Sequence, residues 1–173
     1  VIIREDDCGT TNGIWVQAIY EGEDEVVKLS ERLVGRFGCE DIVDPTDPKN
    51  IEKALTPKTR AIYGETIGNP RGSILDIEAI ANIAKSKRIP LVVDNTFATP
   101  YLCRPMDFGA DIVVHSATKF VGGHGTYIGG ALLESGNFDY THYPSIADPS
   151  PSYNNLKFYE TFGHYGFLMK ARA

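Results

Sequence analysis

Residues 111–125 read Asp-Ile-Val-Val-His-Ser-Ala-Thr-Lys-Phe-Val-Gly-Gly-His-Gly, and this stretch decides the fold class. It begins with an apolar run of strand length, continues through hydroxyl side chains to a lysine, and ends in a glycine-rich turn. Similar apolar runs occupy 61–65, 91–94 and 128–133. Between the first two, an amphipathic pattern with Asp76 as N-cap predicts a helix. Short buried strands that alternate with helices predict an α/β fold, with a mostly parallel sheet in three layers.

The same patterns divide the chain into three parts. Residues 1–41 are predicted to be a divergent N-terminal segment, in which 24–37 has helical spacing. Residues 42–136 hold the α/β core. Residues 137–173 begin rich in Pro, Ser, Tyr and Asn, and they predict an extended loop followed by a helix over 156–172. The chain starts without Met, which we interpret as a processed or partial chain.

Composition excludes several classes of protein. The chain has 173 residues, of which 42% are hydrophobic and 23% charged, as in an ordinary globular domain. No apolar run approaches the roughly 20 residues that span a bilayer, so we expect no membrane partner. The net charge of −6 argues against a nucleic-acid partner but permits a local basic pocket for a phosphate or carboxylate.

The three cysteines are sparse and far apart. Cys8, Cys39 and Cys103 show neither CxxC nor zinc spacing, so we expect no metal site. An odd, sparse set fits free thiols in a reducing compartment and predicts a cytoplasmic protein. Cys103 has no identifiable partner and is interpreted as an inert packed thiol.

Reactive side chains follow the three predicted strands. In open parallel sheets, ligands bind beyond the carboxyl ends of the strands, so these side chains predict one pocket. The candidates are Glu65 and Asn69 after the first strand, Asp94 at the end of the second, and Ser116, Thr118 and Lys119 after the third.

This set suits the chemistry of pyridoxal phosphate. A lysine amine such as Lys119 can form a Schiff base with a carbonyl. A carboxylate facing the pyridine nitrogen, here Asp94, would keep that nitrogen protonated. Ser116 and Thr118 could supply hydroxyls to the phosphate.

Structural explanations of the same residues stay open. Asp94 could cap a helix or bind a metal, and Ser116 and Thr118 could be plain loop hydroxyls. Asn69 before a proline is a natural turn residue, and Glu65 could only close a structural hydrogen bond. We interpret the two histidines of the stretch 111–125, His115 and His124, as structural.

Three ordered motifs carry a resemblance to a known family. The stretch 111–125 resembles the cofactor-attachment signature of the Cys/Met-metabolism pyridoxal-phosphate enzymes. Residues 65–70 (Glu-Thr-Ile-Gly-Asn-Pro) and 94–100 (Asp-Asn-Thr-Phe-Ala-Thr-Pro) are similar to two further family motifs. Residues 148–153 and 169–172 are similar to the O-acetylhomoserine sulfhydrylase branch. The resemblance covers about residues 42–173.

The resemblance implies the large-domain core of fold-type I pyridoxal-phosphate enzymes and a role for each candidate. Lys119 would hold the cofactor and move protons, and Asp94 would pair with the pyridine nitrogen. Ser116 and Thr118 would bind phosphate, and Asn69 would lie near the phenolic oxygen and the substrate carboxylate. Glu65 would not contact the cofactor itself but would hold these residues in position.

The implied activity is γ-replacement on O-acetylhomoserine with sulfide to give homocysteine, a step in methionine biosynthesis. The implied partners are the amino-acid substrate, sulfide and further copies of the chain. A γ-lyase and a cystathionine synthase are alternatives, because enzymes of both kinds in this family use the same core. A truncated non-catalytic remnant is a further alternative, because family members are more than twice as long. The glycine-rich stretch 122–130 lacks both nucleotide-binding spacings, G-x-G-x-x-G and GK[ST].

Overall fold

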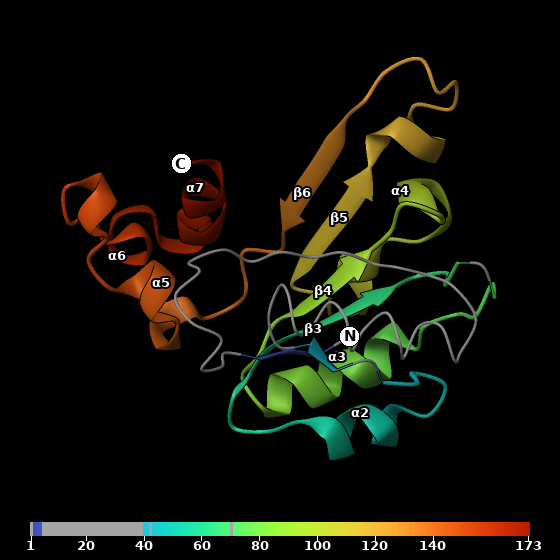
Figure 1. Ribbon diagram of the computed structural model, residues 1–173, viewed down its shortest axis with the longest axis horizontal. Coiled ribbons are helices and arrows are strands. Elements are labelled where there is room, and N and C mark those ends of the chain that lie inside the picture. Colours follow the sequence, from blue (N-terminus) through green and yellow to red (C-terminus); the bar gives the residue numbers. More distant parts are fainter. Residues whose placement is uncertain (1, 5–39, 42, 70) are drawn as a thin grey trace.

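A six-stranded sheet forms the centre of the structure, a computed structural model that describes residues 2–4, 40–41, 43–69 and 71–173 (Figure 1). The strands lie side by side in the order β2-β1-β3-β4-β5-β6. Their bounds are β1 Ile2–Arg4, β2 Glu40–Asp41, β3 Thr59–Glu65, β4 Leu91–Asp94, β5 Ile112–Ser116 and β6 Gly130–Glu134. The helix expected over 24–37 lies outside the described residues, as do Cys8 and Cys39.

Strand direction is mostly parallel, as predicted. The central strands β3, β4 and β5 pair in parallel, and β2 runs in the same direction. β1 and β6 run the opposite way. A parallel return would need a crossover, usually through a helix, whereas the connection over 117–129 brings the chain back antiparallel beside β5.

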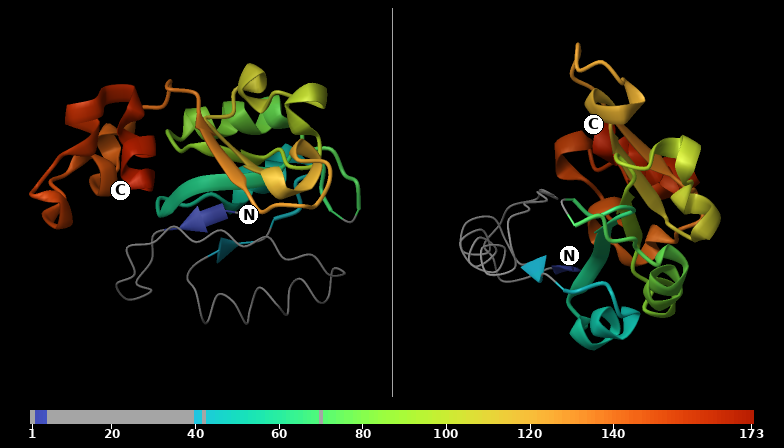
Figure 2. Two further views of the ribbon diagram at one scale, coloured as in Figure 1. Left: turned by 90° about the horizontal axis from the view of Figure 1, so that it is seen from above. Right: turned by 90° about the vertical axis from the view of Figure 1, so that its right-hand side faces the viewer.

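One face of the sheet is covered by α2 (Pro48–Ala54) and α3 (Ile77–Ser86), which Figure 2 shows beside the strands. The side chain of Asp76 caps α3 by accepting a hydrogen bond from the Ala79 N–H at 3.0 Å, as the sequence predicted. The buried side of α3 packs against apolar residues of β3, β4 and β5, including the fully buried Leu91 and Val93. The described residues thus show two of the three expected layers.

Short helices follow β4 and β5 at the carboxyl ends of these strands. They are α4 (Thr99–Leu102) and η1 (Pro105–Phe108) after β4, and η2 (Ala117–Val121), a π-helical turn, after β5. Pro100 and Pro105 stand in the first turns of α4 and η1, where a missing N–H leaves no hydrogen bond unmade.

The C-terminal residues form a small lobe beside the sheet (Figure 1). It consists of η3 (Tyr140–His142), α5 (Pro144–Ala147), η4 (Pro151–Tyr153), α6 (Phe158–Phe162), η5 (Gly163–Tyr165) and α7 (Gly166–Arg172). Tyr140, Ile146 and Phe158 are its buried centre.

The structure differs from the sequence expectation in this lobe. Residues 137–155, expected as an extended loop, contain three short helical segments. The single helix expected over 156–172 is broken at Gly163, whose φ of 56° and ψ of −127° are accessible mainly to glycine. In the described part of the chain, no helix is both long enough and apolar enough to cross a membrane.

Candidate functional site

The three parallel strands end at one edge of the sheet and bring their terminal residues together. Glu65, the last residue of β3, is the register partner of Asp94, the last residue of β4. Asp94 in turn lies opposite Val114, two residues before Ser116 at the end of β5. Because side chains alternate along a strand, Glu65, Asp94 and Ser116 share one face of the sheet.

The carboxylate of Asp94 is held from both sides. Its Oδ2 accepts a hydrogen bond from the Tyr63 hydroxyl at 3.0 Å, and its Oδ1 accepts one from the Thr96 N–H at 2.8 Å. Tyr63 is buried and stands one side-chain repeat before Glu65 on β3. The carboxylate therefore has a fixed orientation at the strand end.

Thr96 joins the ends of β4 and β5. Its hydroxyl oxygen accepts a hydrogen bond from the Ser116 N–H at 2.7 Å, while its own N–H donates to Asp94. The two strand ends that carry Asp94 and Ser116 are thus locked through one threonine side chain.

The Thr118 hydroxyl forms hydrogen bonds with Gly129, just before β6. Its hydroxyl donates to the Gly129 carbonyl at 3.2 Å and accepts from the Gly129 N–H at 2.9 Å. The single hydroxyl proton of Thr118 is therefore directed at Gly129, and the contact closes the turn between β5 and β6.

Lys119 is exposed and lies in η2, directly after the end of β5. Its ψ of −122° interrupts the helical geometry of that turn, and π-type turns of this kind occur frequently at functional sites. Beside it, Phe120 packs edge-on against Phe97 with ring centroids 5.0 Å apart. This contact fixes the segment carrying Lys119 to the segment that follows Asp94.

Glu65 and Asn69 belong to the loop after β3. Glu65 Oε2 accepts a hydrogen bond from the Asn69 N–H at 3.1 Å, and the Asn69 side chain is exposed. The carboxylate of Glu65 therefore holds the loop that presents Asn69 at the same edge.

Three residues that shape this edge were missed by sequence reasoning. Tyr63 and Thr96 orient Asp94, and the fully buried Asn95 accepts from the Thr66 hydroxyl at 2.7 Å and donates to the Cys103 carbonyl at 2.8 Å. The two-residue spacing from Asp94 to Thr96 is that of an Asx-turn and could have signalled Thr96. No local signal links Tyr63 to Asp94.

The two histidines of the stretch 111–125 and Cys103 are not part of the hydrogen bonds that orient Asp94. His115 is buried, with Nδ1 lacking a hydrogen bond from any described residue, and His124 Nδ1 lies 3.0 Å from the Gly122 carbonyl. Cys103 is a partly buried free thiol, and burial, followed by the charge of Asp107, raises its pKa. Among the described residues, no three His, Cys, Asp or Glu side chains gather as a metal site would require.

Comparison with known proteins identifies the family. Residues 10–150 match the model of the Cys/Met metabolism PLP-dependent enzymes, where PLP is pyridoxal 5′-phosphate, and the chain belongs to this family. It is 49% identical over 141 residues to the O-acetyl-L-homoserine sulfhydrylase of Leptospira meyeri, covering 76% of this chain and 32% of that protein. It is 44% identical to the homocysteine synthase of Schizosaccharomyces pombe, again over 76% of this chain and 32% of the relative.

Solved structures agree with this family. A putative O-acetylhomoserine (thiol)-lyase from Campylobacter jejuni, which carries a pyridoxyl-lysine phosphate, superimposes with a TM-score of 0.74 at 34% identity. The match covers 85% of this chain and 38% of that one. The O-acetylhomoserine sulfhydrylase of Wolinella succinogenes gives 0.69 at 37% identity, covering 88% and 40%. The predicted α/β fold is thereby confirmed, and the chain spans about a third of the length of the curated relatives it matches.

Proposed function

We propose that the protein contributes the cofactor-binding core for PLP-dependent γ-replacement on O-acetylhomoserine with sulfide, which yields homocysteine for methionine biosynthesis. The observation that carries this proposal is the fixed carboxylate of Asp94 beside the strand end that leads to Lys119. The O-acetyl-L-homoserine sulfhydrylase at 49% identity and the homocysteine synthase at 44% identity support the substrate class.

The chemistry of the donor set fits the cofactor. A carboxylate held by two donors suits a protonated pyridine nitrogen, and an exposed amine suits an aldehyde. When bound, pyridoxal phosphate draws electrons from the α-carbon of an amino acid, so that the α-proton becomes acidic. Asp94 would keep the proton on the ring nitrogen, and Lys119 would hold the cofactor covalently.

The other candidates would bind and position. Ser116 would donate its hydroxyl to the phosphate, and Thr118 would do so only after its proton turns away from Gly129. Asn69 would lie near the phenolic oxygen and the substrate carboxylate, with Glu65 holding its loop in place. The amine of Lys119, once free, would take the proton from the substrate α-carbon and return it later.

A second candidate is a cofactor-binding domain that does not convert substrate by itself, because the chain spans about a third of the length of the relatives it matches. Both candidates share the cofactor edge and differ in whether substrate is converted.

Cofactor loading followed by turnover distinguishes the two. We expect the chain to become yellow with pyridoxal phosphate, and borohydride to fix the cofactor mass on Lys119. Lys119→Ala should lose this covalent mass, whereas Asp94→Asn should keep it, and the exposed Lys49→Ala serves as the control. Homocysteine formation from O-acetylhomoserine and sulfide then identifies an active enzyme, and loading without turnover identifies a cofactor-binding domain that does not convert substrate by itself. Absence of covalent mass on Lys119 would overturn the proposed site.

We further propose that the chain forms a homo-oligomer in the cytoplasm. Large apolar side chains on the segments after β4 and β5 support this, because exposed apolar patches on soluble proteins usually mark interfaces. Water-soluble amino-acid and sulfide substrates, together with a sparse set of cysteines, support the compartment.

A further inference from the structure

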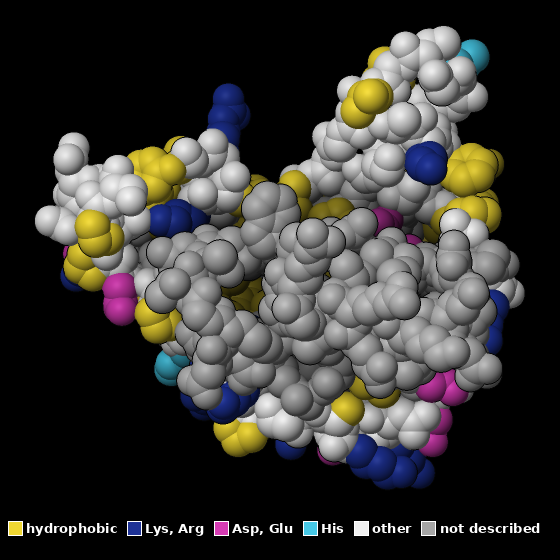
Figure 3. Space-filling model, viewed as in Figure 1, with side chains coloured by type: hydrophobic (Ala, Val, Ile, Leu, Met, Phe, Trp, Pro, Cys, Tyr) yellow, Lys and Arg dark blue, Asp and Glu magenta, His cyan; other side chains and the backbone are white. Residues whose placement is uncertain are grey.

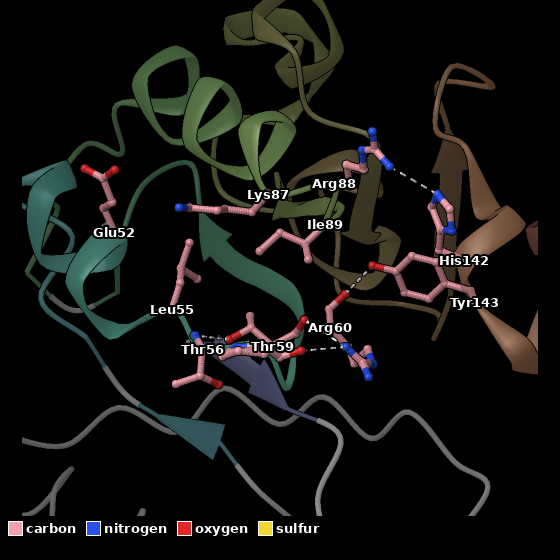
Figure 4. A pocket seen from close by; sticks show the side chains of 11 residues that line it. Glu52, Leu55, Thr56, Thr59, Arg60, Lys87, Arg88, Ile89, His142 and Tyr143 are labelled. Atoms are coloured by element: carbon pink, nitrogen blue, oxygen red, sulfur yellow. Dashed lines mark hydrogen bonds between the residues drawn. The ribbon is translucent and has the colours of Figure 1, made fainter.

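A pocket lies at the opposite edge of the sheet from the cofactor candidates, where β3 begins and where α3 leads into β4. It has a volume of about 490 Å³, within the usual range for small-molecule pockets. Figure 4 shows its walls, to which α2, the end of α3, the start of β3 and the C-terminal lobe all contribute. None of the residues assigned to the cofactor lines it.

The charged side chains that line this pocket are mainly cationic. Among the residues that the structure describes, Arg60, Lys87 and Arg88 line it together with one carboxylate, Glu52. Neither Lys87 nor Arg88 forms an ion pair with a residue that the structure describes. A basic pocket on a chain with a net charge of −6 is a local concentration of positive potential that attracts anions.

The cations extend in different directions. In Figure 4, Lys87 extends toward Leu55 on the α2 side, whereas Arg88 extends toward His142 on the lobe side. Arg88 Nη1 lies 3.5 Å from His142 Nε2. Two positive groups at opposite ends of one pocket suit a ligand with two separated negative groups.

Arg88 occupies a backbone position that normally belongs to glycine. The Ile89 N–H bonds the Ala84 carbonyl and the Arg88 N–H bonds the Lys85 carbonyl, each at 3.1 Å, which is the Schellman pattern at the end of α3. Arg88 holds the left-handed position of this motif with a φ of 56°. Glycine would adopt this conformation without strain, so the arginine side chain is kept here at a cost in backbone energy.

The pocket also joins two parts of the molecule. The Tyr143 hydroxyl of the C-terminal lobe donates to the Arg60 carbonyl of β3 at 2.9 Å, and His142 meets Arg88 beside it. A ligand bound here would contact both the α/β core and the lobe, and binding would stabilise their association.

We propose that this pocket binds a small dianion with acidic groups at both ends, such as a dicarboxylate or a phosphorylated carboxylic acid. Arg88 anchors one acidic group and Lys87 the other. Charge-assisted hydrogen bonds from these side chains supply the affinity, and the separation of the cations supplies the preference for two charges over one.

Succinate and acetate at equal ionic strength test the proposal on the full chain. We expect saturable binding of succinate by calorimetry, with an affinity for acetate at least about tenfold weaker, as expected for loss of one charge-assisted contact. Lys87→Gln should remove most of this difference. Arg88→Gly should weaken the binding of both anions and raise the midpoint of thermal unfolding by about 2–4 °C, because the strained residue is replaced.

Two controls make the outcome decisive. Arg104→Gln removes an exposed cation that pairs with Asp107 outside the pocket, and Ser116→Ala alters the cofactor edge. Both should bind succinate as the unmodified chain does. Equal binding of succinate and acetate, unchanged binding in Lys87→Gln and Arg88→Gly, or an equal loss in either control would overturn the proposal.

Discussion

At the scale of single residues, Asp94 depends on a hydrogen bond from a buried phenol. Tyr63 is 5% exposed and donates to Asp94 Oδ2 at 3.0 Å. We expect Tyr63→Phe to lower the free energy of unfolding by about 1–3 kcal/mol, because the carboxylate loses a donor that water cannot easily replace. Urea unfolding measures this loss. Tyr101→Phe, at a position 93% exposed, should change stability by less than about 0.5 kcal/mol. Equal stability of the two variants would show that the buried bond contributes nothing.

Glu134, at the end of β6, gives the protein a pH-dependent stability. Both of its carboxylate oxygens are buried and lack a well-formed hydrogen bond among the described residues. Burial raises the pKa of Glu134, and the nearby Tyr140 hydroxyl opposes this shift without cancelling it. The folded state therefore holds the proton more tightly than the unfolded state does. Its stabilising contribution is complete below the ordinary pKa of 4.5 and is lost as the pH rises through the raised value.

We expect Glu134→Gln to raise the free energy of unfolding by about 1 kcal/mol at neutral pH, since no buried charge then forms. The gain should vanish at acidic pH, where Glu134 itself is protonated. Thermal unfolding followed from acidic to neutral pH tests this difference. A gain or loss of the same size at every pH would contradict the assignment to Glu134.

At the scale of elements, α3 depends on a cap that the sequence makes visible. Asp76 accepts from the Ala79 N–H, and we expect Asp76→Ala to reduce stability by about 1 kcal/mol. Asp76→Asn, which retains an acceptor oxygen, should recover most of this loss. Chemical unfolding of the three proteins measures both effects. If the Ala and Asn variants were equally destabilised, the cap would not be the cause.

The C-terminal lobe depends on a close approach between two helices. A Cβ at Gly166, the first residue of α7, would lie 2.9 Å from Tyr159 Cα and 3.1 Å from the Phe158 carbonyl oxygen, both in the backbone of α6. We therefore expect Gly166→Ala to destabilise the lobe by about 1–3 kcal/mol. Hydrogen exchange should become faster over 137–173 while β3 to β5 keep their protection. Unchanged exchange throughout the lobe would contradict this packing role.

Local patterns were sufficient to predict the core elements, whereas tertiary contacts decided the rest. β3, β4, β5 and α3 follow from apolar runs and a cap within each segment. The reversal into β6 depends on Thr118 meeting Gly129 across the turn, and the aromatic centre of the lobe forms only when separate short helices meet. Likewise, the place of Asp94 at a strand end could be predicted from the sequence. The hydrogen bond from Tyr63 could not, because Tyr63 lies on another strand and meets Asp94 only in the folded chain.

At the scale of the whole molecule, the two edges of the sheet have different characters. The carboxyl edge carries Asp94, Ser116 and Lys119, with large apolar side chains exposed around them. The amino edge carries the basic pocket and the C-terminal lobe. Figure 3 shows hydrophobic side chains at the surface in the region of α4 and of the turn between β5 and β6. Association through this surface would place a second chain beside the proposed cofactor edge.

The last prediction concerns that association. Tyr101 and Ile128 are 93% and 95% exposed, and burying them against a second chain would remove a large apolar area from water. We expect the average mass in sedimentation experiments to rise above 19.0 kDa with increasing concentration. The double variant Tyr101→Lys and Ile128→Lys should stay at the mass of one chain, because a charged side chain cannot be buried there unpaired. Asn137→Lys, which adds a charge at an exposed position away from these segments, should associate as the unmodified chain does. A single-chain mass for the unmodified protein at every concentration would contradict the proposed homo-oligomer.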